Sequence, residues 1–195
     1  MRWEVKILFY KGENMVIYET ERLIIRKWED SDCYDLYDYA KDIEVTKFLN
    51  FPPYESLQVA KDRIEKLKAD YLSKEVEGDF AVELKSEKKV IGSISIVEYK
   101  EKNEGQVEIG YLLGTKYQGF GYMTEALVGM FKYIKANKIA KRITAKHDTE
   151  NSKSGNVMKR AGMTYEGTLR KAGKNNLHSR YDIAIYSILD EEIEI

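Results

Sequence analysis

The sequence is poor in the residues that build disulfides and metal sites. It holds one cysteine, Cys33, and two histidines, His147 and His178, among 195 residues. A single cysteine cannot close an internal disulfide, and these three side chains show none of the spacings of a zinc site. The sequence therefore predicts a chain that needs no metal, and its low cysteine content fits a reducing, cytoplasmic location.

Prolines and long apolar runs are also scarce. Pro52 and Pro53 are adjacent, and no Pro- or Ser-rich linker or internal repeat divides the chain. No stretch approaches the roughly 18 apolar residues of a membrane-spanning helix. The charged N-terminal segment does not resemble a secretory signal. We therefore expect one domain over residues 15–195, preceded by residues 1–14 as either an extra strand or an extension outside the domain.

A net excess of charge is absent as well. The chain has 32 Lys and Arg against 33 Asp and Glu, a net charge of -1. This balance argues against a protein that coats nucleic acid, which needs a basic excess. It hides two opposed segments, since residues 114–174 hold thirteen bases and four acids, a charge of +9, and the rest carries -10. The basic segment would attract an anion.

Acidic residues gather near the N-terminus. Residues 29–44 contain seven acids and one base. As one wall of a binding site, this segment would suit a cationic amine or a basic peptide. The ordinary alternative is a solvated helix face.

Hydrophobic spacing predicts the element order βααβββαβαββ, a mixed α/β or α+β domain. Alternating apolar residues predict strands over 17–27, 80–84, 90–99, 107–113, 142–146, 163–169 and 180–189. Apolar residues with helical spacing predict helices over 33–40, 56–72, 123–134 and 152–161. Short polar connections within 80–113 favour antiparallel hairpins, and Gly162 is expected to cap the last helix.

Glycine is concentrated at one junction. Six of the thirteen glycines lie between positions 105 and 129, and Gly119 and Gly121 stand just before the helix predicted over 123–134. A glycine-rich loop at a helix start exposes backbone N–H groups that can bind phosphate. Thr124 replaces the third glycine of a dinucleotide fingerprint, and no Gly-Lys-Ser/Thr follows. The sequence thus predicts a phosphate cradle that is neither a Rossmann nor a Walker loop.

The segment YQGFGYMTEA at 117–126 resembles the acyl-CoA-binding signature of the GNAT N-acetyltransferase superfamily. Four further motifs fit the same family in the same order: ERLIIR at 21–26, EIGY at 108–111, NxxS with RAGM at 151–163, and EGxLR at 166–170. The first and last are typical of the branch that includes the ribosomal-protein N-terminal alanine and serine acetyltransferases. The resemblance covers about residues 17–190. It implies the acyl-CoA N-acyltransferase fold, a central, mostly antiparallel twisted sheet flanked by helices.

Two positions depart from the family pattern. Lys116 stands where the loop motif usually begins with Gln or Arg, which matters little because the loop binds through its backbone. Met158 stands where many members carry a tyrosine that protonates the leaving thiolate. The usual acid is therefore missing.

The resemblance also implies roles for individual residues. Acetyl-CoA would place its pyrophosphate on a set of backbone N–H groups, those of Gln118, Gly119, Phe120, Gly121, Tyr122, Met123 and Thr124. Its pantetheine arm would pair with Leu112, Leu113 and Gly114, where an N–H near Leu112 would face the thioester oxygen.

Three polar residues are candidates for proton transfer and cofactor orientation. Glu108 is the candidate base, directly or through water, and Ser154 the candidate donor to the sulfur, with Asn151 orienting the cofactor. Each has an ordinary alternative: an exposed cross-strand carboxylate for Glu108 and helix capping for Ser154 and Asn151. Glu125 is interpreted as a surface residue favoured by the helix dipole.

The function implied is direct transfer of acetyl from acetyl-CoA to a primary amine, preferably a protein N-terminal α-amine. A small amine, such as a polyamine or an antibiotic, is the first alternative. A non-catalytic acyl-CoA-binding module is the second, because Met158 replaces the usual acid. A homodimer is compatible with the resemblance, and no nucleic acid, membrane or metal partner is expected.

Overall fold

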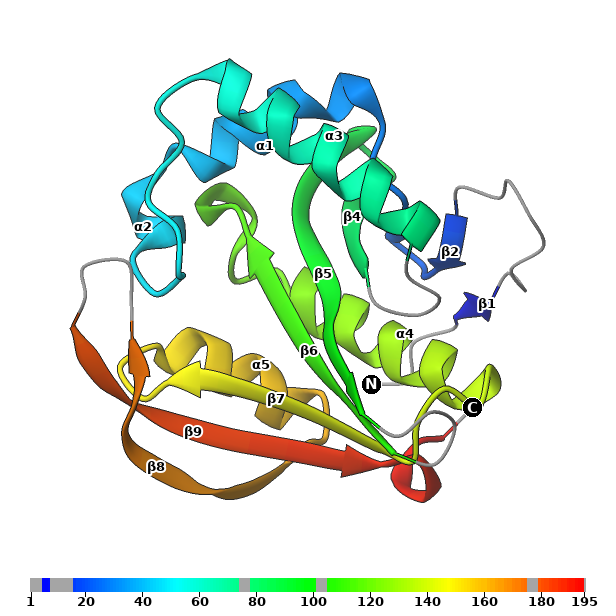
Figure 1. Cartoon of the computed structure of the whole chain (residues 1–195). Coiled ribbons are helices and arrows are strands. Elements are labelled where there is room, and N and C mark those ends of the chain that lie inside the picture. Colours follow the sequence, from blue (N-terminus) through cyan, green and yellow to red (C-terminus); the bar gives the residue numbers. More distant parts are fainter. Residues whose placement is uncertain (1–4, 8–15, 74–77, 101–104, 175–178, 195) are drawn as a thin grey trace.

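The computed structural model of the chain describes residues 5–7, 16–73, 78–100, 105–174 and 179–194 (Figure 1). In these residues nine strands form one sheet in the order β1-β2-β3-β4-β5-β6-β7-β9-β8. The strands are β1 Lys6–Ile7, β2 Val16–Glu19, β3 Leu23–Arg26, β4 Gly78–Leu84, β5 Lys89–Lys100, β6 Gln106–Leu113, β7 Arg142–Asp148, β8 Thr164–Lys174 and β9 Arg180–Leu189. Only β6 and β7 pair in parallel, so the sheet is mostly antiparallel, as predicted.

Helices cover both faces of this sheet. Helices α1 (Cys33–Ala40), α2 (Ile43–Thr46) and α3 (Leu57–Ser73) lie over one face, and α4 (Tyr122–Ala136) and α5 (Ser152–Arg160) over the other (Figure 1). Short 3₁₀ turns precede α1 and α4 and follow β9, at η1 (Asp30–Asp32), η2 (Thr115–Tyr117) and η3 (Asp190–Glu192). The predicted α+β fold class is confirmed.

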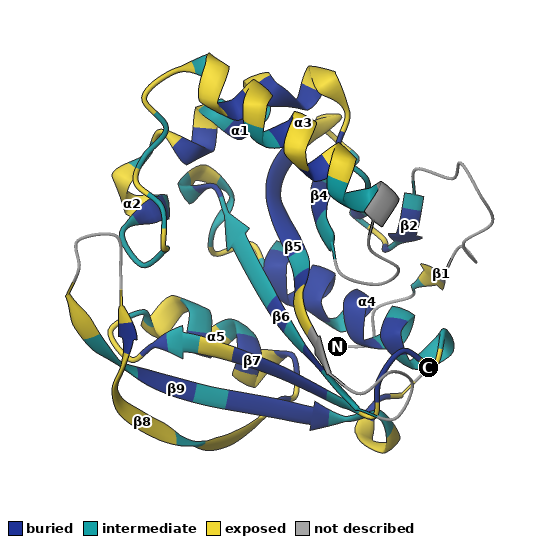
Figure 2. Ribbon diagram, viewed as in Figure 1, coloured by how far each residue is buried: buried dark blue, intermediate teal, exposed yellow. Residues whose placement is uncertain are grey.

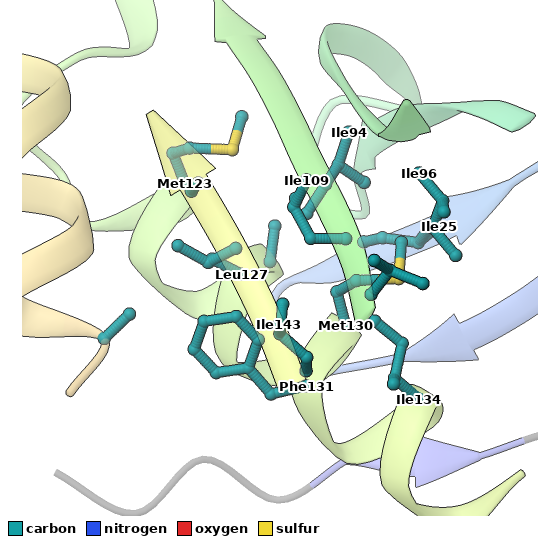
Figure 3. Packing of buried hydrophobic residues seen from close by; sticks show 14 of the residues in the cluster. Ile25, Ile94, Ile96, Ile109, Met123, Leu127, Met130, Phe131, Ile134 and Ile143 are labelled. Atoms are coloured by element: carbon teal, nitrogen blue, oxygen red, sulfur yellow. The ribbon is translucent and has the colours of Figure 1, made fainter. Parts of the chain in front are cut away.

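The larger hydrophobic core lies between α4 and the sheet. The apolar stripe of α4 supplies Met123, Leu127, Met130, Phe131 and Ile134, which are at most 3% exposed. In Figure 3 these side chains meet isoleucines from β3, β5, β6 and β7. A smaller cluster, with Trp28, Leu36 and Ile64, lies under α1 and α3. Helices α1 and α3 are accordingly buried on the side that faces the sheet and exposed on the opposite side (Figure 2). The core therefore holds the start of α4 rigidly beside the end of β6.

Two details differ from the sequence prediction. Residues 17–27 do not form one strand, because the chain turns between β2 and β3 and the two pair antiparallel. The turn is closed by Thr20, whose N–H donates to Leu23 O at 3.0 Å and whose Oγ1 accepts from Leu23 N at 3.0 Å. The short helix α2 was also not predicted, and its N-cap is Asp42, which accepts from Glu44 N at 2.9 Å.

The N-terminal segment is described only in part. Within residues 1–14, the structure describes 5–7, where Lys6 and Ile7 pair with Glu19 and Tyr18. The rest of that predicted segment lies outside the described residues, so the boundary at residue 15 stays a prediction. No helix in the described ranges has the length and apolar character needed to cross a membrane.

Candidate functional site

The centre of the sheet opens between β6 and β7. The two strands pair from Gln106 with Arg142 to Ile109 with Ala145 and then separate, while β7 continues along β9 to Asp148. Figure 1 shows them meeting at one end and diverging towards the other. The last four residues of β6, Gly110 to Leu113, are therefore not paired with β7, and this opening between the two strands is called the gap below. Leu112 and Leu113 belong to the segment predicted to bind the cofactor arm.

The backbone of β6 offers N–H groups to this gap. Gly114 N–H donates to Ile91 O of the neighbouring chain segment at 2.9 Å. Alternation along an antiparallel ladder then turns the N–H groups of Leu112 and Gly110 towards β5, and those of Tyr111 and Leu113 towards the gap. Of the three residues predicted to pair with the cofactor arm, Leu112, Leu113 and Gly114, only Leu113 directs its N–H towards the gap. Tyr111, which was not in that set, also does so.

The glycine-rich loop closes one end of the gap. Gly119 and Gly121 have φ values of 89° and 82°, the left-handed region that favours glycine. The first α-helical bond of α4 runs from Glu125 N to Gly121 O at 3.0 Å. The N–H groups of Tyr122, Met123 and Thr124 therefore have no acceptor within the helix. Gln118 contributes no N–H to this cradle, because its N–H donates to Thr115 O at 3.2 Å.

Two side chains complete the cradle. The Thr124 hydroxyl is buried and finds no hydrogen-bond partner among the described residues. Gln118 bridges the two sides of the gap, donating from Nε2 to Leu113 O at 3.1 Å and accepting from Lys153 Nζ of α5 at 2.9 Å. An anion would satisfy the free N–H groups. These residues therefore fit a pyrophosphate group.

Glu125 is not a surface residue, so that part of the interpretation was wrong, but it lies in the first turn of α4, where the helix dipole favours an acid. Its side chain is fully buried and accepts from Thr20 Oγ1 at 2.5 Å, from Arg22 N at 3.0 Å and from Arg22 Nε at 2.7 Å. Arg22 also donates to Phe120 O at 3.1 Å and stacks on the Tyr122 ring at 4.5 Å. The β2–β3 turn thus anchors the loop through a charged contact more than 100 residues away in sequence.

Ser154 lies at the first turn of α5, opposite β6. Its Oγ donates to the hydroxyl of Tyr111 at 3.0 Å, and that hydroxyl donates to Ser154 O at 3.0 Å. Asn151 is the N-cap of α5, and its Oδ1 accepts from Ser154 N at 3.2 Å, so the capping interpretation of Asn151 is confirmed. Burial raises the pKa of Tyr111 well above that of a free tyrosine, and its hydroxyl therefore stays protonated.

Tyr111 is a functional candidate that sequence reasoning missed. The position expected to hold an acidic tyrosine, Met158, is 1% exposed and packs into the core. A tyrosine hydroxyl reaches the start of α5 from β6 instead. The motif EIGY already contained this residue, but nothing in its spacing indicated that its ring would reach across the gap to Ser154.

Glu108 lies on the sheet face that α1 and α3 cover, on the same side of β6 as Gly110 and Leu112. Its side chain is 19% exposed, and Oε1 is 2.8 Å from Lys146 Nζ of β7. The carboxylate therefore forms a cross-strand ion pair where β6 and β7 begin to separate. It borders the gap and remains accessible to water.

Most acids of the segment 29–44 are bonded within the chain, and Asp35, Asp38 and Asp42 together line a small pocket beside the η2 turn. Asp35 accepts from Val90 N at 2.9 Å, Asp42 accepts from Thr115 Oγ1 at 2.7 Å, and Asp38 lies 3.3 Å from Lys116 Nζ. Two further acids pair with lysines, Asp30 with Lys68 and Glu44 with Lys47, and Asp32 is paired with Arg26. Of these carboxylates, Asp35 fastens α1 to β5, and Asp38 and Asp42 link the end of α1 and the start of α2 to the η2 turn. Within the described ranges, no cluster of three His, Cys, Asp or Glu could hold a metal ion.

Comparison with known proteins agrees with this geometry. The family model described as "Acetyltransferase (GNAT) domain" matches residues 22–164. The uncharacterized N-acetyltransferase p20 of Bacillus licheniformis is 33% identical over 176 residues, which cover 89% of this chain and 96% of that protein. The [Ribosomal protein uS5]-alanine N-acetyltransferase of Escherichia coli (strain K12) is 32% identical over 81 residues, 42% of each chain.

A solved structure with a similar fold contains acetyl-CoA. The microcin C7 self immunity acetyltransferase MccE, in complex with acetyl-CoA and AMP, superposes with a TM-score of 0.78 at 25% identity. The match covers 87% of this chain and 93% of that one.

Proposed function

The chain belongs to the GNAT acetyltransferase family and is an acetyl-CoA-dependent acetyltransferase, and from this premise we propose its acceptor and the roles of its residues. The acceptor is a primary amine, with a protein N-terminal α-amine preferred. The observation that carries the proposal is the gap between β6 and β7, closed at one end by the free N–H groups of α4. The partial likeness to the uS5-alanine acetyltransferase supports the α-amine.

Donor binding follows from the unpaired backbone groups. The N–H groups of Tyr122, Met123 and Thr124 and the positive end of the α4 dipole hold the diphosphate. Tyr111 and Leu113 offer N–H groups along the gap to the extended amide arm and to the thioester oxygen. Acetyl-CoA supplies an activated acetyl thioester, and everything else is positioning and proton transfer by this chain.

Proton transfer is assigned to two groups on opposite sides of β6. Glu108 takes the proton of the incoming ammonium, directly or through water, since its carboxylate borders the gap. The Ser154 hydroxyl proton, which is bonded to the Tyr111 oxygen in this structure, turns to the departing sulfur, while the Tyr111 hydroxyl stays bonded to Ser154 O. A serine has a pKa too high to titrate here, so Ser154 stabilises the thiolate by hydrogen bonding while solvent supplies the proton.

The decisive assay is release of free CoA thiol in the presence of an acceptor panel. The panel contains N-terminal Ala and Ser peptides, polyamines and aminoglycosides, each with acetyl-CoA. Thiol release that depends on an amine, with an acetylated product by mass spectrometry, is expected. CoA binding without transfer to any amine or peptide would establish the binding-module alternative instead.

Glu108→Gln should lower kcat/KM roughly 100-fold, the usual contribution of a general base, and should flatten the acid limb of its pH profile. Glu166→Gln is the matched control. Glu166 also forms an ion pair, with Arg142 at an N–O distance of 2.8 Å, and this pair does not border the gap. An unchanged pH profile in Glu108→Gln would reject the assignment and leave a cross-strand ion pair.

Ser154→Ala should lower kcat by roughly 10- to 100-fold with little change in the KM for acetyl-CoA, because the hydrogen bond to sulfur forms only as the thiolate leaves. Ser152→Ala is the control, since Ser152 is exposed on the same helix turn. A purely capping Ser154 would instead lower the unfolding temperature without a selective loss of kcat.

A small cationic amine is the second candidate acceptor, favoured by a pocket under α1 and α3 that is described below. Cytoplasmic location and a homodimer are also proposed; size-exclusion chromatography with light scattering tests the dimer.

A further inference from the structure

A pocket lies on the α1 and α3 face of the sheet and reaches β6 at Leu112. Its volume is about 40 Å³, enough for a small polar group. Aromatic side chains of Trp28, Tyr39 and Tyr54 line it, together with the single carboxylate of Asp79. None of these residues is needed for donor binding.

Asp79 is an unusual occupant of this site. Its side chain is only 19% exposed, and its Oδ1 accepts from Trp28 Nε1 at 2.9 Å. The paired cation, Arg63 Nη2, stays 3.9 Å from Oδ2, beyond hydrogen-bond distance, and is itself 40% exposed. Burial raises the pKa of Asp79 to about 6, against hydrogen bonds from Trp28 and Ser93 and the charge of Arg63 that lower it. At neutral pH the Asp79 carboxylate is therefore largely ionised, and its charge is offset by the hydrogen bonds from Trp28 and Ser93 and by the more distant guanidinium of Arg63, which lines the same pocket.

Tyr39 contributes a second polar group to this pocket. Tyr39 is 6% exposed, and its hydroxyl finds no hydrogen-bond partner in the described part of the chain. A buried orphan hydroxyl costs stability, so a ligand that donates to it would recover a hydrogen bond. Aromatic faces beside a carboxylate are the surroundings that bind ammonium and guanidinium groups.

We propose that this pocket binds a second cationic group, an ammonium or guanidinium, on the acceptor whose primary amine is acetylated. The inference rests on the proposed function, which puts the reacting amine at the gap beside Gly110 and Leu112. Asp79 is opposite Ser95, and Ser95 is opposite Gly110. Two strand spacings separate the cation site from the reacting end by about 10 Å.

Small residues occupy the strand positions between these points, and the Val97 side chain lies 3.0 Å from a Cβ built at Gly110. Gly110 has no side chain, and small Ser93 and Ser95 occupy the β5 positions on this face. Among the residues that line this pocket Asp79 is the one carboxylate, so it is the group that would meet the second cation.

The test compares acceptors that differ only at the far end. An alkyl monoamine, the α,ω-diamine and the ω-amino acid of equal length are assayed with acetyl-CoA, beside peptides with Lys or norleucine at residue 2. The diamine or the Lys peptide should exceed its neutral analogue in kcat/KM by roughly 10- to 100-fold, and which pair shows it identifies the source.

Asp79→Asn should abolish that preference while leaving kcat/KM for the monoamine unchanged, and Tyr39→Phe should reduce the preference several-fold. Asp62→Asn is the control, since Asp62 is an exposed acid of α3 bonded to Gln58 at 2.7 Å.

The raised pKa of Asp79 means that the folded chain loses stability as the pH rises towards 6. The Asp79→Asn variant should therefore keep or raise the unfolding temperature at pH 7.

Three outcomes overturn the inference. These are equal kcat/KM for monoamine and diamine, an unaltered preference in Asp79→Asn, or a preference for the ω-amino acid, which would make Arg63 the recognition group. Each of them leaves amine acetylation itself intact. Absence of acetylation of every amine would instead reject the proposed function.

Discussion

Gly119→Val should weaken CoA binding by at least about 100-fold and leave the chain folded. A β-branched residue at φ 89° is strained, so the loop would move to relieve it and misdirect the N–H groups of Tyr122 to Thr124. The added side chain would also project into open space at the loop, since nothing lies within 4 Å of a Cβ built there. That space is where an anion must approach. Isothermal titration with CoA measures the loss.

Gly162→Val is the matched control for backbone strain. Gly162 has φ 91°, also has open space at its Cβ, and follows α5 far from the loop. Both variants should lose a similar free energy of unfolding, of the order of 1–2 kcal/mol, but only Gly119→Val should lose CoA. Equal CoA affinity in the two variants would show that the loop is not the cradle.

Glu125→Ala should reduce the free energy of unfolding by about 3–5 kcal/mol, because it leaves Arg22 and Thr20 without their buried acceptor. For a chain of this length the unfolding temperature should fall by roughly 6–20 °C. Chemical denaturation and calorimetry measure both quantities. Glu65→Ala, which removes an exposed acid from α3, should change stability by less than about 0.5 kcal/mol.

A double-mutant cycle separates the ion pair from the cavity. Arg22→Met should cost at least as much as Glu125→Ala, because it leaves the fully buried Glu125 carboxylate without a counter-charge, whereas the Arg22 left by Glu125→Ala is 32% exposed. The double variant should be less destabilised than the sum of the two single variants. Strict additivity, or a loss near 1 kcal/mol for Glu125→Ala, would contradict the buried charged contact.

The fold could be predicted where apolar side chains repeat with a regular period over many residues. The stripe from Met123 to Ile134 predicts α4 because its spacing is helical and unbroken, and its burial is confirmed. The β2–β3 turn was missed because Thr20-Glu21-Arg22 contains no Gly, Pro or Asn. A threonine side chain closes that turn, which composition does not indicate.

The same difference applies to the site: residues set by local conformation could be predicted, and residues set by distant contacts could not. Gly119 and Gly121 were identifiable because positive φ selects glycine, and this local property leaves a mark in sequence. Glu125 was not identifiable, since its partners Thr20 and Arg22 lie more than 100 residues away. Asp79 gave no signal either, because a single acid next to Gly78 at a strand start usually faces solvent.

The acids of 29–44 left two interpretations open, a wall for a cationic acceptor or a solvated helix face. In the structure Asp35, Asp38 and Asp42 are bonded to other parts of the chain, and the Asp38 side chain is still 54% exposed. Charge counts along a sequence do not distinguish an acid that is already paired from one that is free. The carboxylate that lines the proposed acceptor pocket, Asp79, stands alone in the sequence instead of in an acidic run.

The short parallel ladder between β6 and β7 has a consequence for the order of folding. Strands β2 to β6 form one series of antiparallel neighbours and β7 to β9 another, joined in the sheet only from Gln106 to Ile109. That join links residues 36 apart across α4, whereas hairpins such as β5–β6 close over short loops. Because loop closure slows non-local pairing, we expect the two series to form first and to dock late. The gap between β6 and β7, where we propose that acetyl-CoA binds, would then form in the last step, when the two series dock.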